Sequence, residues 1–282
     1  MRPLPRGIGE MLISTSFFAL MNLCVRFLPR IPTHETVFFR ALGVLCLAGF
    51  SLWRLKIPIW GQQRRWLLLR GFYGTLGLNL YFWTLQQMPL ASAVTLQYLS
   101  PIFSAVAAIP LLGEKPPRRQ WFCFALAFAG VLLVKGFDPR LGWLAFGAGV
   151  LGAVCSALAY TYVRRLRHSD HPLVTVFYFP VVTLCLTGPY TLTHWVRPQG
   201  QEWLWLILIG LFTHGAQYYL TRALQAEQIA LVSQVNYLGL LYALGLGALL
   251  FGEHIPLLAG LGMLLIVIGV ILGSLSARRA AP

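Results

Sequence analysis

The segment LASAVTLQYLSPIFSAVAAIPLLGE, residues 90–114, occurs in a second version as IALVSQVNYLGLLYALGLGALLFGE, residues 229–253. The two segments align at a constant offset of 139 residues, and each ends in a Gly-Glu pair. A polar pair, Gln97-Tyr98 in the first copy and Asn236-Tyr237 in the second, lies near the first third of each. Each copy is apolar and about long enough to cross a bilayer as a helix. The duplication predicts two related halves that meet around these segments.

The composition of the chain is that of an integral membrane protein. Of its 282 residues, 57% are hydrophobic and 11% are charged, and the mean hydropathy is +0.69; a soluble domain has about a quarter charged residues. The net charge of +14 comes from basic residues in short loops, where they orient helices, so we expect a lipid bilayer and no nucleic acid as partner. The five cysteines lie inside apolar runs without a C-x-x-C pair, which predicts neither disulfides nor a metal site.

Apolar runs of helical length predict the fold class: an all-α integral membrane protein with ten transmembrane helices. A barrel would show alternating hydrophobicity, which the runs lack. The first run follows Arg2 and Arg6 without a small-residue cleavage site, so we expect an uncleaved first helix. The predicted spans are residues 8–28, 35–54, 66–86, 91–112, 119–136, 141–163, 172–193, 203–222, 229–250 and 256–275.

The basic residues predict the orientation of these helices. With the N-terminus in the cytoplasm, cytoplasmic loops receive sixteen of the twenty-two Lys and Arg residues, Arg70 among them, and the opposite side receives five. Cytoplasmic loops of membrane proteins carry such an excess, so both termini should be cytoplasmic.

The same charge map predicts that the halves have inverted topology. Five helices per half place the loop after Glu114 in the cytoplasm and the loop after Glu253 outside, and only the first of these loops contains Lys or Arg. We therefore expect a five-helix repeat over residues 1–139 and a second over 140–282, together one transport domain. Inverted repeats are typical of secondary transporters, which bind their solute near the midplane between the repeats.

Several stretches resemble the drug/metabolite transporter superfamily, and within it the EamA-type ten-helix carriers. They are HETVFFRAL at 34–42, LLRGFYGTLG at 68–77, the paired L-x-G-E ends, and FAGVLLV and VIGVILG near the end of each half. The resemblance covers nearly the whole chain and implies alternating access around a central cavity. The E-x-x-F-x-R pattern that ends at Arg40, with the LRG that follows, is also similar to a branch containing S-adenosylmethionine carriers.

Polar and aromatic residues on the faces of these spans are the candidate substrate-binding residues, because polar groups that face lipid are costly. On the fourth span, Ser100 and Ser104 share a face with Gln97; on the third, two polar stripes compete, one with Tyr81 and one with Trp83. Hydrogen bonds between helices and aromatic packing are the alternative role for each residue. The candidates are Asn22, Arg40, Tyr81, Trp83, Gln97, Tyr98, Tyr160, His214, Gln217, Tyr218, Asn236 and Tyr237.

Three residues have two interpretations each. Pro101 removes a backbone donor and should kink the fourth span, either as a gating hinge or as a static bend that shapes the cavity. Arg40, inside the second span, either reaches the interface or pairs with Glu35 or a carbonyl, or attracts a substrate carboxylate or phosphate. His214 is either a hydrogen-bonding neutral residue or a proton switch.

Taken together, these features predict a bacterial inner-membrane secondary transporter of a small organic metabolite, amino-acid-like or nucleoside- or cofactor-like. The alternatives are a flippase-like lipid-handling protein and an S-adenosylmethionine uptake carrier. No catalytic constellation and no cofactor site are expected. A proton or a counter-substrate is a candidate coupling partner, and the chain is expected to work as a monomer or a homodimer.

Overall fold

A computed structural model describes residues 6–113, 142–226, 238–252 and 257–279, together with parts of 121–133. These residues form helices and no strand. The helices are α1 (Arg6–Arg26), α2 (Thr33–Arg54), α3 (Arg64–Gln87), α4 (Leu90–Gln97), α5 (Ser100–Leu112), α7 (Trp143–Arg165), the short 3-10 helix η1 (Leu166–His168), α8 (Pro172–Thr193), α9 (Glu202–Ala226), α11 (Leu238–Phe251) and α12 (Leu257–Arg279).

Most of the described helices begin and end within a few residues of the predicted spans, and the first part of the span predicted over 229–250 lies outside the described residues. The span predicted over 91–112 is interrupted: α4 ends at Gln97 and α5 begins at Ser100. Proline lacks the N–H that would bond the carbonyl four residues earlier, so Pro101 leaves the Gln97 carbonyl without its helical partner. The intervening Tyr98 and Leu99 keep right-handed backbone angles, so the interruption is a local turn.

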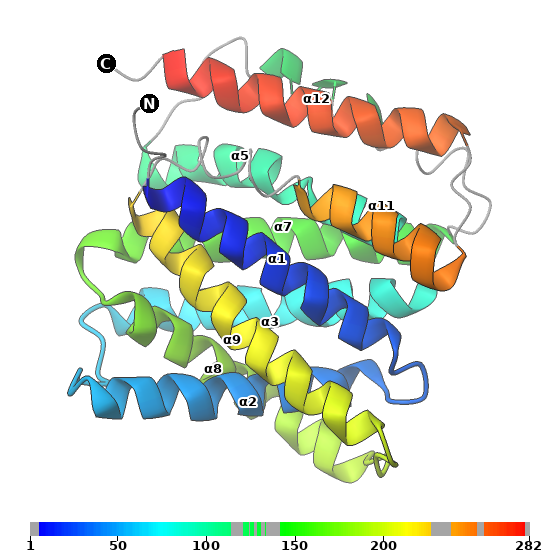
Figure 1. Ribbon diagram of the computed structural model, residues 1–282. Coiled ribbons are helices and arrows are strands. Elements are labelled where there is room, and N and C mark those ends of the chain that lie inside the picture. The colour runs from blue at the N-terminus through cyan, green and yellow to red at the C-terminus, as the bar shows by residue number, and fades with distance from the viewer. Residues whose placement is uncertain are drawn as a thin grey trace.

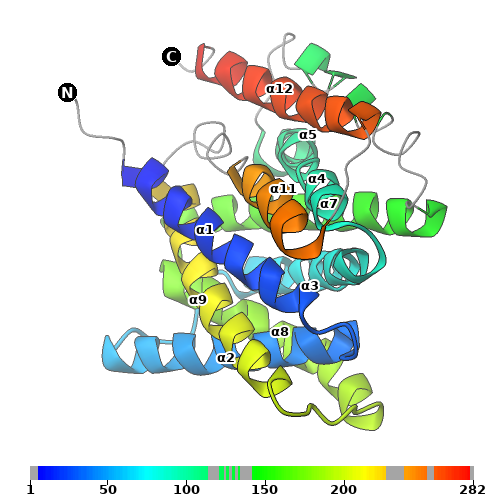
Figure 2. The same cartoon turned by 45° about the vertical axis from the view of Figure 1, so that its right-hand side comes forward.

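Helices from the two ends of the chain pack against each other. α1 packs on α9, α2 on α8 and α9, α3 on α7, and α4 on α11. Figures 1 and 2 show α1 crossing α9 and the terminal helix α12 at the outer edge of the bundle. The core therefore combines segments far apart in the sequence.

Glycines allow the closest helix contacts. A Cβ on Gly43 of α2 would lie 2.7 Å from the Cα of Gly210 in α9. Gly77 and Gly152 allow a similar approach of α3 to α7, where a Cβ on Gly77 would lie 3.0 Å from the Gly152 carbonyl oxygen. Small residues at such crossings are typical of helix packing in membranes.

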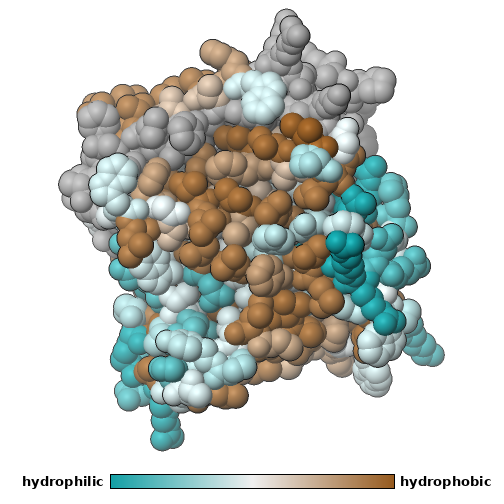
Figure 3. Space-filling view, turned by 180° about the vertical axis from the view of Figure 1, so that it is seen from behind, coloured by the Kyte–Doolittle hydropathy of each residue, from teal (hydrophilic) through white to brown (hydrophobic). Residues whose placement is uncertain are grey.

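The surface has an apolar belt between two polar ends. Five stretches of the described residues are long and apolar enough to span a membrane: Gly7–Arg26, Thr33–Arg54, Ser92–Leu112, Trp143–His168 and Pro172–Thr193. Figure 3 shows a broad hydrophobic surface across the middle of one face, with hydrophilic residues at the right edge and lower left. An exposed apolar surface of this extent is unusual for a soluble monomer and suits contact with lipid.

Hydrogen bonds and ring contacts bring many of the arginines together at one end, which we call the basic end. Arg165 lies over the Trp66 ring at 4.3 Å, and Arg65 over the same ring at 5.4 Å. Asp170 ties the end of α9 to the α2–α3 loop, because its carbonyl accepts from Gln225 and its carboxylate accepts from the Gln62 amide. The start of α1 and the end of α12 lie at the same end of the bundle (Figure 1).

Candidate functional site

A cavity of about 120 Å³ lies in the interior of the bundle. Residues of α1, α2, α3, α4, α5, α7, α8, α9 and α11 line it, so segments from both sequence halves form its wall. The lining combines aromatic rings with polar groups, as ligand sites generally do.

Seven of the predicted site residues lie around this cavity. α1 provides Asn22, α3 provides Tyr81, and the broken fourth span provides Gln97 and Tyr98. The others are Arg40 of α2, Tyr160 of α7 and Gln217 of α9. The structure thus brings together residues that are far apart in the sequence.

Three predicted residues lie away from the cavity lining. Trp83 packs against the main hydrophobic core, and Tyr218 packs on a smaller core near the basic end, where its hydroxyl accepts a hydrogen bond from Arg222 at 3.4 Å. His214 is half-buried and its Nδ1 has no hydrogen-bond partner. Asn236 and Tyr237 lie outside the described residues.

Arg40 neither reaches the interface nor pairs with Glu35. Its side chain is only 2% exposed, so it does not reach the interface. The Glu35 carboxylate instead accepts a hydrogen bond from the Val196 amide at 3.0 Å. The Arg40 guanidinium faces the cavity, and its Nε has no partner.

The assignment of Arg70 to a cytoplasmic loop is wrong. α3 begins at Arg64, so Arg70 lies almost two turns inside the helix, 3% exposed and facing the cavity. The predicted span over 66–86 already contains Arg70, so its assignment to the loop with Arg64 and Arg65 conflicts with that span as well as with the structure. The spacing of Arg70 from Gly74, Leu78 and Tyr81 was the available signal, since these residues form one helical stripe along the cavity.

Other residues that line the cavity were not among the predicted substrate-binding residues. Phe179 of α8 and Thr15 of α1 had no signal, because a phenylalanine or a threonine in an apolar run is ordinary core composition. Ser100, which the spacing placed on a candidate face, does line the cavity, and so does Ser156, whereas Ser104 donates to the Ala157 carbonyl at 3.3 Å.

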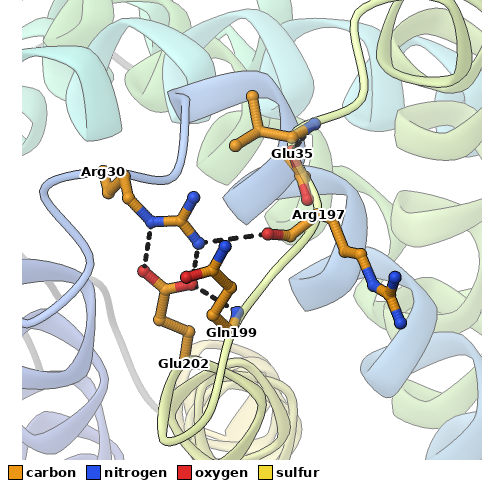
Figure 4. Close-up of polar contacts among 6 residues, drawn as sticks. Arg30, Glu35, Arg197, Gln199 and Glu202 are labelled. Carbon is orange, nitrogen blue, oxygen red and sulfur yellow. Dashed lines mark hydrogen bonds and ion pairs between the residues drawn. The ribbon is translucent and has the colours of Figure 1, made fainter.

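Polar contacts connect the sequence halves at the end opposite the basic end, which we call the Glu202 end (Figure 4). Arg30, between α1 and α2, donates from Nε to Glu202 Oε1 at 2.9 Å, and from Nη2 to the other carboxylate oxygen and to the Arg197 carbonyl. The Gln199 amide donates to Glu202 at 2.6 Å. The hydrogen bond from Arg30 holds the pKa of the Glu202 carboxyl below its usual range, and the same contact raises the pKa of Arg30.

A second set of contacts connects the halves at the basic end. Arg222 of α9 forms an ion pair with Glu10 of α1 at 2.5 Å. An apolar cluster lies beside this pair, between the cavity and the helix ends: Met11, Val163, Leu220, Ala223 and Leu224, with Phe18 and Tyr160 packed on it. The cavity thus lies between two regions where the halves touch.

Comparison with known proteins identifies the family to which this architecture belongs. The EamA-like transporter family matches residues 5–136 and again residues 143–275. The chain belongs to the EamA-like transporter family. Members of this family and the chain's relatives are transporters, which agrees with the prediction that the chain is not an enzyme.

Several transporters are similar to this EamA-like transporter. The pseudopaline exporter of Pseudomonas aeruginosa is 31% identical over 278 residues, covering 95% of each chain. The riboflavin transporter of Vibrio cholerae is 28% identical over 74% of this chain and 71% of its own length. Solute carrier family 35 member G1 of Mus musculus is 25% identical over 89% of this chain and 73% of its own length.

One solved crystal structure has the same fold. It is 20% identical, with a TM-score of 0.69, and the match covers 97% of this EamA-like transporter and 98% of that chain.

The described part of the EamA-like transporter holds no group of three or more His, Cys, Asp or Glu residues that could bind a metal ion. Its cavity offers amides, hydroxyls, guanidinium groups and rings, which bind a solute through hydrogen bonds, charge and stacking.

Proposed function

We propose that this chain is a secondary transporter that moves a small organic metabolite across a bacterial inner membrane by alternating access. Residues 1–139 and 140–282 would form two five-helix repeats of inverted topology. The double match to the family, over residues 5–136 and 143–275, supports the duplication. The separation of a basic end from the Glu202 end supports the membrane orientation, with the basic end in the cytoplasm.

The observation that carries the proposal is the central cavity, whose wall comes from both halves. A solute held there touches both repeats, so a rocking motion of one repeat against the other changes the side from which it can leave. A purely structural role in the membrane would not explain why polar residues line an interior cavity.

The contacts at the two ends of the cavity are the proposed gates. The Arg30–Glu202 pair and the Glu35–Val196 hydrogen bond would break when the Glu202 end opens. The Glu10–Arg222 pair and the apolar cluster beside it would separate when the basic end opens. Pro101, at the interruption between α4 and α5, is the proposed hinge.

Solute counterflow tests the proposal. The purified protein is reconstituted into liposomes loaded with a candidate solute, and uptake of the labelled solute is followed. Export is the direction to test first, because the pseudopaline exporter shares 31% identity. We expect counterflow for at least one solute among organic acids, amino acids, nucleosides and S-adenosylmethionine.

A second assay separates transport of solutes from lipid handling. Fluorescent lipids in the same liposomes report whether the protein moves lipid between leaflets. Lipid movement without counterflow of any solute would contradict the proposed function and support the flippase-like alternative.

A further inference from the structure

Two arginines are buried side by side at the cavity, and no acidic partner lies beside them in the part of the chain that the structure describes. Arg40 and Arg70 are 2% and 3% exposed, and both line the cavity. Their guanidinium carbons lie 5.3 and 4.2 Å from the centre of the same Phe179 ring. The two positive charges are therefore closer together than the screening length of about 10 Å in 0.1 M salt.

The protein satisfies these two groups only in part. Arg70 donates from Nη2 to Gln217 Oε1 at 3.0 Å, but its Nε and Nη1 have no partner. The Arg40 Nε also lacks a partner, and a second ring, that of Phe82, lies 5.8 Å from its guanidinium carbon. Aromatic rings attract cations but supply no hydrogen-bond acceptor in the guanidinium plane.

No acidic residue compensates the charge from within the wall. The described lining residues include neither Asp nor Glu. Glu35, the acid of α2, bonds the Val196 amide at the Glu202 end, and Glu10 pairs with Arg222 at the basic end. Buried charges in proteins are normally paired. The two arginines therefore leave a positive charge that the described wall of the cavity does not neutralise.

We propose that the cavity binds a small organic anion with two negative charges, which Arg40 and Arg70 neutralise together. The proposal rests on the proposed transport function and names its substrate class. A dicarboxylate or a phosphate ester suits this pair of arginines, because arginine's planar fork matches both groups. Phe179, Tyr81 and Tyr160 would contact the uncharged body of the molecule.

The volume of the cavity limits the size of the anion that it can hold. An engineered cavity of about 150 Å³ holds one benzene molecule, and the present one is about 120 Å³. In this conformation the site therefore suits a molecule of about the size of a single ring or a short chain.

The hydrogen bond between Arg70 and Gln217 suggests how the anion affects the protein. Arg70 belongs to α3 of the first half and Gln217 to α9 of the second. Arg70 therefore links the proposed anion site to a contact between the two halves.

Thermal stabilisation and counterflow test the substrate class. The purified wild-type protein is heated at pH 7.5, in a chloride buffer without multivalent anions, with succinate, glutarate, glycerol phosphate or inorganic phosphate. Butyrate, succinamide and S-adenosylmethionine are the monoanionic, neutral and cationic controls. We expect a rise in melting temperature with a dianion and none with the three controls, and counterflow of the stabilising dianion.

Three variants separate binding from structure. In Arg40→Gln and Arg70→Gln, we expect the apparent affinity for the dianion to fall more than about tenfold, since hydrogen bonds to charged groups are the strong ones. We expect the melting temperature of the empty protein to stay unchanged or rise, because an uncompensated buried charge is lost. Arg54→Gln, at an exposed arginine, is the control and should behave as wild type.

The outcomes distinguish the two proposals. Counterflow of a neutral or cationic solute, with no effect of any dianion, overturns the anion site and leaves the transport function intact. A lower melting temperature in both cavity variants, with unchanged dianion counterflow, shows that the arginines are structural and also overturns the site. Stabilisation by only the dicarboxylates or only the phosphates supports the site and identifies its anion.

Discussion

At the scale of single residues, some predicted site residues line the cavity and others do not. Asn22 lines the cavity, and its Oδ1 is buried without a hydrogen-bond partner. His214 belongs to a helix that lines the cavity, but its side chain does not reach it. Mutation of Asn22 therefore tests the cavity lining, and mutation of His214 is its control.

We predict that Asn22→Ala raises the apparent KM for counterflow about three- to tenfold, the usual effect of losing one hydrogen bond. His214→Ala should change the KM less than twofold. Counterflow kinetics in liposomes check both values. A larger effect of His214→Ala than of Asn22→Ala would contradict the placement of the cavity.

The ion pair between Arg30 and Glu202 makes the stability of the folded protein depend on pH. The pKa of Glu202 lies below the ordinary value of 4.5 because Arg30 donates to the ionised carboxylate. The contribution of the pair is complete above this ordinary value and is lost as the pH falls through the lower pKa of the folded protein. The pair is partly exposed, so the effect is small.

We therefore expect wild type to melt at a higher temperature than Glu202→Gln at pH 7, and the difference to shrink as the pH falls below 4.5. Thermal melting of both proteins over this pH range measures it. A difference that stays constant over the range would show that the carboxylate charge does not stabilise the folded state.

At the scale of helices, the crossing of α2 and α9 depends on two glycines. An added Cβ at Gly43 would lie 2.7 Å from the Gly210 backbone, which cannot move as a side chain can. We predict that Gly43→Ala destabilises the protein by about 1–3 kcal/mol, the usual cost of overpacking. Thermal unfolding in detergent, followed by tryptophan fluorescence, measures the change.

Gly147 of α7 is the matched control, since a Cβ there would meet no atom within 4 Å. Gly147→Ala should leave the melting temperature unchanged or slightly higher, because alanine favours the helix. If the two variants melt alike, α2 and α9 do not approach as closely as described.

The interruption between α4 and α5 predicts a kinetic effect. Pro101→Ala restores a backbone donor near the Gln97 carbonyl, and Tyr98 and Leu99 already have right-handed angles. We expect one continuous helix, a higher melting temperature and a slower counterflow rate. An unchanged rate in the stabilised variant would mean that Pro101 shapes the cavity without acting as a hinge.

At the scale of the whole molecule, much of the fold could be predicted because hydrophobic run length and loop charge are local signals. The bounds of α2 and α8 agree closely with the predicted spans. The cavity depends on helix rotation, which local signals do not determine. The third span had two predicted polar stripes, and neither is the lining face as a whole: packing against α7 and α8 turns Tyr81 to the cavity together with Arg70, Gly74 and Leu78. Arg70 lies within the predicted third span, but only the rotation of α3 in the packed bundle turns it towards the cavity.

The placement of both helix ends predicts the topology in the cell. The start of α1 and the end of α12 lie at the same end (Figure 1), and basic residues predict that this end is cytoplasmic. A fluorescent protein fused after Pro282 should fluoresce in bacterial cells, and alkaline phosphatase fused there should be inactive. Active phosphatase at this position would reverse the orientation.

The two arginines beside Phe179 also have an electrical consequence. They lie within the helices and are not matched by an acid in the described wall, so the empty cavity carries charge that any reorientation displaces in the membrane field. One elementary charge that crosses 100 mV gains or loses about 2.3 kcal/mol. The return of the empty carrier would then depend on voltage, whereas a carrier neutralised by a dianion would move through the same field without electrical work.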